Sequence, residues 1–271
     1  MRTLAQALER ARQLGIDRLD AQLLVAHLVG RPRTWVLAND ATALSESQCE
    51  TLQDQLLRRR AGEPLAYLVG EKEFHGLMLK VNPDVLVPRP DTETLVDWAL
   101  ECLASAPLQP PVLDLGTGSG AIALALAHAW PAAQVCAVDA SEAALRVAHA
   151  NGMRLGLSVQ WMAGDWCSTL GERRFALIVS NPPYVAERDV HLHALQHEPT
   201  QALCAGADGL DAIRTIVPQA PGHMLPNAWL LLEHAHVQAA AVQELLLKAG
   251  FANVTTRTDL SGQWRCTGGQ R

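Results

Sequence analysis

The sequence lacks long hydrophobic runs. No uninterrupted stretch of about 18 apolar residues, the length that a membrane-spanning helix requires, occurs among its 271 residues. Residues 1–7 lack the apolar core of a signal peptide and are typical of the start of an amphipathic helix. These absences argue against a membrane protein and against an export signal.

Paired cysteines are also absent. The six cysteines stand at positions 49, 102, 136, 167, 204 and 266, and no two of them form a C-x-x-C pair. The sequence therefore signals neither a zinc site nor a disulfide framework, and we expect a protein of the reducing cytoplasm.

An excess of positive charge is missing as well. The formal net charge is -6, whereas an enzyme of duplex DNA is expected to carry a basic stripe that follows the phosphates. The basic cluster Arg58-Arg59-Arg60 is typical of a solvated helix end, where cations complement the helix dipole. Contact with an acidic protein partner or with RNA is its functional alternative. We expect no stable binding of nucleic acid.

The most informative segment present is Asn181-Pro182-Pro183-Tyr184, which follows the hydrophobic run 175–179. In open α/β sheets, ligands bind at the carboxyl ends of the strands. The Asn181 side-chain oxygen and the Pro182 carbonyl can each accept one N–H bond from a planar –NH2 group. Pro183 stiffens the turn, and Tyr184 offers an aromatic face for stacking. The segment predicts a grip on an amide or an exocyclic amine; a simple Asn-Pro turn is the alternative.

A second informative segment is a glycine-rich turn after a predicted strand at 112–115. Its glycines stand at 116, 118 and 120, with Thr117 and Ser119 between them, and a helix is predicted at 121–130. Glycines let a backbone approach a ligand closely. The next predicted strand, 134–138, ends at Asp139, whose carboxylate can accept bonds from ribose hydroxyls or cap the helix that begins at Ser141. Together with the turn, the ribose role is favoured.

These segments resemble the class I S-adenosylmethionine-dependent methyltransferases that methylate amino groups. Within that class the chain is similar to the protein-(glutamine-N5) methyltransferases of peptide-chain release factors. The resemblance covers nearly the whole chain, and its further segments are 62–68, 73–76, 87–94, 164–166, 208–211, 249–251 and 259–262. His75 and Ala205-Gly206 depart from the family pattern, which favours an aromatic residue and Gly-Gly at these places.

The resemblance implies a cofactor and roles for residues. S-adenosylmethionine is the implied cofactor, with its methionine part at the glycine turn, its ribose at Asp139 and its adenine between Asp165 and Trp166. Core packing is the alternative for Trp166. The predicted catalytic residues are Asn181, Pro182, Pro183 and Tyr184. The predicted cofactor-binding residues are Gly116, Thr117, Gly118, Ser119, Gly120, Asp139, Asp165, Trp166 and Asn181.

The order of patterns along the chain predicts three regions. Residues 1–72 form a helical substrate-docking domain, with Leu52, Leu56 and Leu57 on one side of a helix. Residues 73–88 form a β-hairpin linker. Residues 89–271 alternate helix and strand patterns, which favours a doubly wound α/β sheet. The resemblance implies a Rossmann-like methyltransferase sheet of seven mostly parallel strands, including one antiparallel strand in the last pair.

Two further segments are the connection 185–204 and the C-terminal residues 268–270. The polar connection 185–204 is typical of a lid or binding loop beside a site. Its His191, His193 and His197 fit no zinc spacing well and bring no cysteine, so we expect an ordinary polar loop without a metal. The C-terminal Gly268-Gly269-Gln270 repeats the substrate triplet that the family implies. A frayed tail is the prediction, with self-methylation as the alternative.

The functional hypothesis is methylation of the glutamine N5 in the Gly-Gly-Gln motif of release factors during translation termination. Methylation of a ribosomal protein glutamine and N6 methylation of adenine in nucleic acid are the enzymatic alternatives. A cofactor-binding docking module without activity is disfavoured by the intact Asn181 and Tyr184. We expect a monomeric enzyme that binds a release factor.

Overall fold

The computed structural model describes residues 2–106 and 108–271 of the chain. The chain divides into two compact units, Met1–Glu71 and Lys72–Arg271. Within the described residues, no helix combines the length and the apolar character that crossing a bilayer requires.

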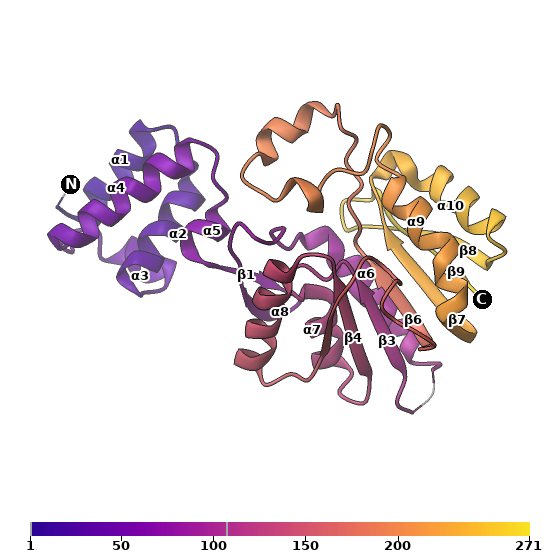
Figure 1. The fold of residues 1–271 in the computed structure, drawn as a ribbon. Coiled ribbons are helices and arrows are strands. Elements are labelled where there is room, and N and C mark those ends of the chain that lie inside the picture. Colours follow the sequence, from indigo (N-terminus) through magenta and orange to yellow (C-terminus); the bar gives the residue numbers. More distant parts are fainter. Residues whose placement is uncertain (1, 107) are drawn as a thin grey trace. The chain divides into compact units, whose positions relative to one another are not determined.

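The described part of the first unit is mainly helical (Figure 1). Its helices are α1 (Leu4–Gln13), α2 (Arg18–Val29), α3 (Arg33–Ala38), α4 (Glu46–Arg60) and α5 (Leu65–Val69). Local sequence determines where they begin, because Thr3 caps α1 and Ser45 forms a capping box with Gln48 at the start of α4.

The core of this unit comes from apolar stripes on its helices. Leu4, Leu24, Leu52 and Leu56 are fully buried. Leu57 was predicted on the same side as Leu52 and Leu56, but it is 46% exposed. That expectation was wrong because one residue turns the helix by roughly 100°, which moves position 57 away from the core.

The basic cluster lies in the last turn of α4. Arg58 bonds to Glu63 at 2.6 Å, and Arg59 bonds to Asp20 of α2 at 2.7 Å. At least two of the three arginines therefore pair within their own unit, as expected for a helix end.

The second unit starts with a short hairpin, β1 (Glu71–Phe74) and β2 (Leu77–Lys80). His75 occupies its turn at a left-handed φ of 48°. Its backbone N–H donates to Glu93 at 3.0 Å, and its Nε2 lies 3.1 Å from Asp97. The residue that departs from the family pattern thus joins the hairpin to the following helix.

The main sheet of this unit has seven strands in the order β5-β4-β3-β6-β7-β9-β8 (Figure 1). The pairs β7–β9 and β8–β9 are antiparallel and the other four pairs are parallel, which confirms the predicted mostly parallel sheet. The strands are β3 (Pro111–Leu115), β4 (Gln134–Asp139), β5 (Gln160–Ala163), β6 (Phe175–Ser180), β7 (Met224–Glu233), β8 (Ala252–Thr258) and β9 (Trp264–Gln270).

Helices cover both faces of the sheet, because alternate strand residues enter two separate apolar cores. The α-helices are α6 (Glu93–Leu103), α7 (Ala121–Ala129), α8 (Glu142–Leu155), α9 (Asp211–Gln219) and α10 (Ala239–Lys248). Val112 of β3 packs with α6 and α7, whereas the neighbouring Leu113 packs with α9 and α10. The 3-10 helices are η1 (Pro90–Thr92), η2 (Val190–Leu195), η3 (Thr200–Ala202), η4 (Ala220–His223) and η5 (His236–Gln238).

The predicted frayed C-terminal tail was wrong. Gly268, Gly269 and Gln270 belong to β9, which pairs with β7 on one side and β8 on the other. A Cβ on Gly268 would stand 2.5 Å from Leu231 and 2.8 Å from Trp98. These glycines are present because the core packs directly against the strand backbone, and no flexible tail is formed.

Candidate active site

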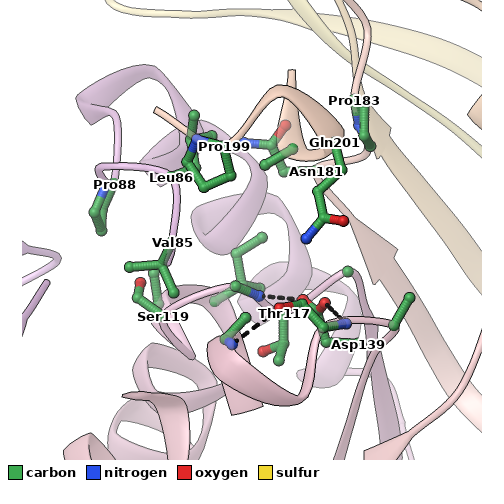
Figure 2. Close-up of a pocket in the computed structure, with 18 of the residues that line it drawn as sticks. Val85, Leu86, Pro88, Thr117, Ser119, Asp139, Asn181, Pro183, Pro199 and Gln201 are labelled. Atoms are coloured by element: carbon green, nitrogen blue, oxygen red, sulfur yellow. Dashed lines mark hydrogen bonds between the residues drawn. The ribbon is translucent and has the colours of Figure 1, made fainter. Parts of the chain in front are cut away.

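A pocket lies at the carboxyl ends of β3, β4 and β6 (Figure 2). The predicted residues that line it are Gly116, Thr117, Gly118, Ser119, Asp139, Asp165, Trp166, Asn181 and Pro183. Gly120, Pro182 and Tyr184 are not among its lining residues. Figure 2 shows Thr117 and Asp139 on one side, with Asn181, Pro199 and Gln201 opposite.

The glycine turn has a backbone that side chains would strain. Gly116, Gly118 and Gly120 have φ angles of 73°, 57° and 83°. A Cβ on Gly118 would meet no atom within 4 Å, so the backbone there faces open space. A Cβ on Gly120 would stand 3.0 Å from Leu124 and 3.1 Å from Trp161, so this glycine serves packing at the start of α7.

Asp139 links the turn to the end of β4. Its Oδ2 accepts the Gly118 N–H at 2.8 Å, and its Oδ1 accepts the Ser141 N–H at 2.8 Å (Figure 2). The N-cap of α8 is Ser141, whose hydroxyl accepts from Ala144, so the capping alternative for Asp139 was wrong. Burial raises the pKa of Asp139, against the lowering effect of these N–H bonds. Each oxygen retains a lone pair that can accept from a diol.

A second carboxylate, that of Asp114, stabilises the glycine turn from the protein interior. Asp114 of β3 is fully buried, and its Oδ2 accepts from the Thr117 hydroxyl at 2.6 Å and the Ala123 N–H at 3.2 Å. Burial raises the pKa of Asp114 to about 7. The bonds hold Thr117 at the pocket and begin α7 in a fixed register.

Trp166 lines the pocket with an unusual backbone. Its φ is 48°, a left-handed value that costs a residue of this size on the order of 1–3 kcal/mol. Its ring lies 3.5 Å from the position that a Cβ on Gly116 would take. The ring also packs against the apolar core, so Trp166 combines the packing and the pocket positions that the sequence left open.

Asn181 comes directly after β6 and presents one side of its amide to the pocket. Its Nδ2 donates to the Thr92 hydroxyl oxygen at 3.1 Å. Within residues 2–106 and 108–271, its Oδ1 accepts no hydrogen bond from the protein. Because the donor group is occupied, the remaining acceptor can serve a ligand N–H.

Tyr184 lies farther along the segment and is directed to the protein interior. Its hydroxyl donates to Glu233 Oε1 at 3.1 Å. Burial raises the pKa of the phenol, and the charge of Glu233 adds to this effect. The hydroxyl is therefore neutral and acts as a donor at physiological pH.

The connection 185–204 contributes Pro199, Gln201 and Ala202 to the pocket. Its ends meet through a bridge between Val185 and Cys204. The side chain of His191 lies outside the described residues. Among the described side chains, no group of three or more His, Cys, Asp or Glu residues is placed to hold a metal ion.

Known proteins match this chain over both units. A family model described as the PrmC N-terminal domain matches residues 1–70, and one described as a methyltransferase small domain matches residues 93–207. The release factor glutamine methyltransferase of Bordetella pertussis is 47% identical over 94% of this chain and 95% of its own. The protein of the same name from Escherichia coli is 41% identical over 98% and 97%.

The chain belongs to the release factor glutamine methyltransferase family. Identity of this size over nearly the full length of both chains shows the family directly.

Solved structures agree on the fold of this methyltransferase. A methyltransferase from Pyrococcus furiosus superposes with a TM-score of 0.54 at 18% identity, over 84% of this chain and 98% of its own. A 16S rRNA N2 methyltransferase from T. thermophilus gives a TM-score of 0.58 at 21% identity, over 74% and 49%. At such identities the likeness supports the class I methyltransferase fold alone.

The residues of the pocket fit S-adenosylmethionine. The open backbone at Gly118 admits a ligand close to the turn. The Asp139 carboxylate suits a ribose diol, and the Trp166 ring suits a flat base. The predicted residues that line the pocket thus offer groups whose chemistry suits each part of the cofactor.

Several residues of this methyltransferase site had no predicted role. Thr92, Glu198 and Glu233 received no role, although they contact Asn181, the pocket segment 85–89 and Tyr184. Thr92 lies in a segment that carried the resemblance, which is the one available signal. Glu198 and Glu233 are distant in sequence, and only their burial singles them out.

Proposed function

We propose that this methyltransferase transfers the methyl group of S-adenosylmethionine to the side-chain N5 of the glutamine in the Gly-Gly-Gln motif of peptide-chain release factors. The observation that carries the proposal is Asn181 Oδ1. This amide oxygen lies beside the pocket that fits the cofactor and accepts no hydrogen bond from the residues that the structure describes. The relatives at 41% and 47% identity bear the name of this activity.

When bound, S-adenosylmethionine supplies a methyl group activated by the sulfonium. The protein has to orient the acceptor amide, whose nitrogen lone pair is delocalised into its carbonyl. Asn181 Oδ1 and the Pro182 carbonyl accept the two N–H groups and favour lone-pair character on nitrogen as the bond to carbon forms. The carbon–sulfur bond breaks in the same displacement.

The proton balance requires no dedicated base. After transfer, the N-methylated amide is strongly acidic and loses its extra proton to solvent. Pro183 restricts the backbone of the Asn-Pro-Pro-Tyr segment, and Tyr184 holds this segment in position. We assign the helical unit, residues 1–72, to docking of the release factor, with the hairpin region 73–88 as linker and 89–271 as the catalytic domain. Because release factors act at ribosomes, we place this monomeric enzyme in the cytoplasm.

The test is transfer of labelled methyl to purified release factor, ribosomal proteins and DNA in parallel. Wild type is compared with Asn181→Ala and with Asn82→Ala, which alters a second Asn-Pro step outside the pocket lining. We expect label on the release factor glutamine, lost in Asn181→Ala and kept in Asn82→Ala. Label on ribosomal protein or DNA, or on a release factor whose glutamine is replaced, would overturn the proposed substrate.

A further inference from the structure

One buried side chain holds the carbonyl group of Tyr184, the last residue of the Asn-Pro-Pro-Tyr segment. Gln238 is the final residue of η5, directly before α10, and it is 8% exposed. Its Nε2 donates to the carbonyl oxygens of Tyr184 and Asp208, each at 3.0 Å. Its Oε1 accepts the Ala235 N–H at 2.9 Å. This one amide therefore joins the segment to the chain at 208 and to the start of η5.

The orientation of the Gln238 amide follows from its partners alone. A backbone carbonyl only accepts hydrogen bonds, and a backbone N–H only donates. The –NH2 group must therefore face Tyr184 and Asp208, and the amide oxygen must face Ala235. Because none of these four groups titrates, the arrangement does not depend on a protonation state.

Gly209 packs against the same carbonyl group. Its φ is 76°, in the left-handed region that favours glycine. A Cβ at this position would stand 2.2 Å from the Tyr184 carbonyl oxygen and 2.8 Å from Gln238 Nε2. Glycine is therefore required here for its conformation and for the space that a side chain would fill. This contact gives a structural reason for the segment 208–211, which carried the family resemblance without a predicted role.

The Asn-Pro-Pro-Tyr segment is thus fixed at both ends. Ser180, directly before it, belongs to β6 in the interior of the sheet. On the other side of the Tyr184 peptide, the Val185 N–H donates to the Leu203 carbonyl at 2.8 Å. The rings of the two prolines between these ends restrict φ to about −65°. Few torsions remain free, so a displacement of the Tyr184 carbonyl also moves the Pro182 carbonyl.

We propose that Gln238 is a positioning residue for the methyl transfer. It fixes the Tyr184 carbonyl directly and, through the stiff segment, the Pro182 carbonyl that accepts a substrate N–H. The inference deepens the proposed function and rests on it, because the grip on the acceptor amide belongs to that function. Neither Gln238 nor Gly209 is among the residues that line the cofactor pocket. Their effect is therefore on the acceptor amide and not on cofactor binding.

The first test is Gln238→Met, compared with wild type in methyl transfer to release factor. Met keeps the length of the side chain and removes all three hydrogen bonds. We expect kcat to fall about 10–100-fold, because a misplacement of about 1 Å caused by a remote substitution can cost this much. The KM for release factor and the Kd of S-adenosylmethionine, measured by calorimetry, are expected to stay close to those of wild type.

Gly209→Ala displaces the same carbonyl by a different route, since the new Cβ collides with it. We expect a comparable loss of kcat, and the double variant should be little worse than either single variant because both act on one unit. Calorimetry also gives the fraction of molecules that bind S-adenosylmethionine. Expressing kcat per binding-competent molecule removes any loss that comes from misfolding alone.

Each variant has a matched control in the second unit. Gln243→Met removes a glutamine amide of α10 that donates to Thr256 at 2.8 Å, away from the Asn-Pro-Pro-Tyr segment. Gly156→Ala places a side chain at a φ of 68°, where a Cβ meets no atom within 4 Å. Both controls are expected to keep the kcat of wild type.

The outcomes separate the two proposals. Wild-type kcat per binding-competent molecule in Gln238→Met, or an equal loss in Gln243→Met, would overturn the positioning role. Should Gln238→Met bind no S-adenosylmethionine, the comparison of Gly209→Ala with Gly156→Ala decides the question by the same criterion. If wild type itself transfers no methyl to release factor, the proposed function fails instead.

Discussion

Arg89 and Glu198 join the connection 185–204 to the segment that lines the pocket. The Arg89 Nη2 and Glu198 Oε1 atoms are 2.5 Å apart, and Glu198 Oε2 accepts the Val87 N–H at 3.0 Å. The Glu198 side chain is 2% exposed. Both oxygens of this carboxylate are bonded, so Glu198 holds together two segments that line the pocket. One segment contains Pro88 and the other contains Pro199.

Glu198→Gln is expected to weaken S-adenosylmethionine binding about tenfold, because it loses the charged bond to Arg89 and loosens the pocket wall. Calorimetry measures the Kd, and the rate of tryptic cleavage after the exposed Arg188 reports the loosening. Glu244→Gln, which removes an exposed pair with Lys248, is the matched control and should change neither. An unchanged Kd together with unchanged cleavage would contradict the role of Glu198.

Asp139→Asn is expected to raise the Kd of S-adenosylmethionine about tenfold or more, because hydrogen bonds to a charged carboxylate are stronger than those to a neutral amide. An amide cannot accept from Gly118 and Ser141 at both positions and also serve a ribose diol. The control is Glu142→Gln in the first turn of α8, which removes a nearby exposed charge. Equal affinities of Asp139→Asn and wild type in calorimetry would remove Asp139 from the cofactor site.

Gly268→Ala is expected to lower the free energy of unfolding by about 1–3 kcal/mol, the usual effect of overpacking a core. The new Cβ would stand 2.5 Å from Leu231 and 3.0 Å from the Leu230 carbonyl oxygen. Denaturant unfolding measures the change. Gly222→Ala, where a Cβ meets nothing within 4 Å, should stay within about 0.5 kcal/mol. Similar stabilities of the two variants would refute the packing of β9.

The same strand makes self-methylation a poor expectation. Gln270 Nε2 donates to the Asn227 carbonyl at 3.0 Å, and Gln270 Oε1 accepts from Asn253 at 2.8 Å. After long incubation with S-adenosylmethionine, we expect the intact mass of the protein to be unchanged. A mass increase of one methyl group mapped to Gln270 would show the opposite.

The raised pKa of the buried Glu233 carboxyl is expected to make the stability of the protein depend on pH. Burial raises its pKa to about 7 in the folded protein, where Arg265 opposes and Asp91 adds to the rise. The folded state therefore binds the proton more tightly than the unfolded chain, and this group makes the protein less stable as pH rises from about 4.5 to 7. Above that range the full cost of the buried charge is present.

Glu233→Gln should remove this dependence. Its free energy of unfolding relative to wild type is expected to increase between pH 5 and pH 8 by on the order of 3 kcal/mol. Urea unfolding at several pH values checks the slope. Glu101→Gln, which removes a carboxylate whose pKa is lowered by its bond to Arg257, is the control and should show no such increase. A relative stability independent of pH would contradict the buried charge.

Local patterns were sufficient for most of the fold. The glycine turn, the strand that ends at Asp139 and the strand before Asn181 lie where the sequence predicted them, because each depends on a short apolar run and a change of backbone conformation. The strand β9 was missed. Its Gly268-Gly269 pair has low strand propensity, and pairing with β7 and β8 holds this segment in the sheet.

The sequence by itself determined the family, the sheet and the residues that come to its carboxyl edge, because motif spacing and hydrophobic period are local properties. Only the tertiary structure decided what surrounds them. Thr92 reaches Asn181 across 89 residues, and Glu198 reaches Arg89 across 109. Such contacts depend on strand order and burial, and no local pattern in this chain encodes which distant carboxylate will be enclosed beside Tyr184.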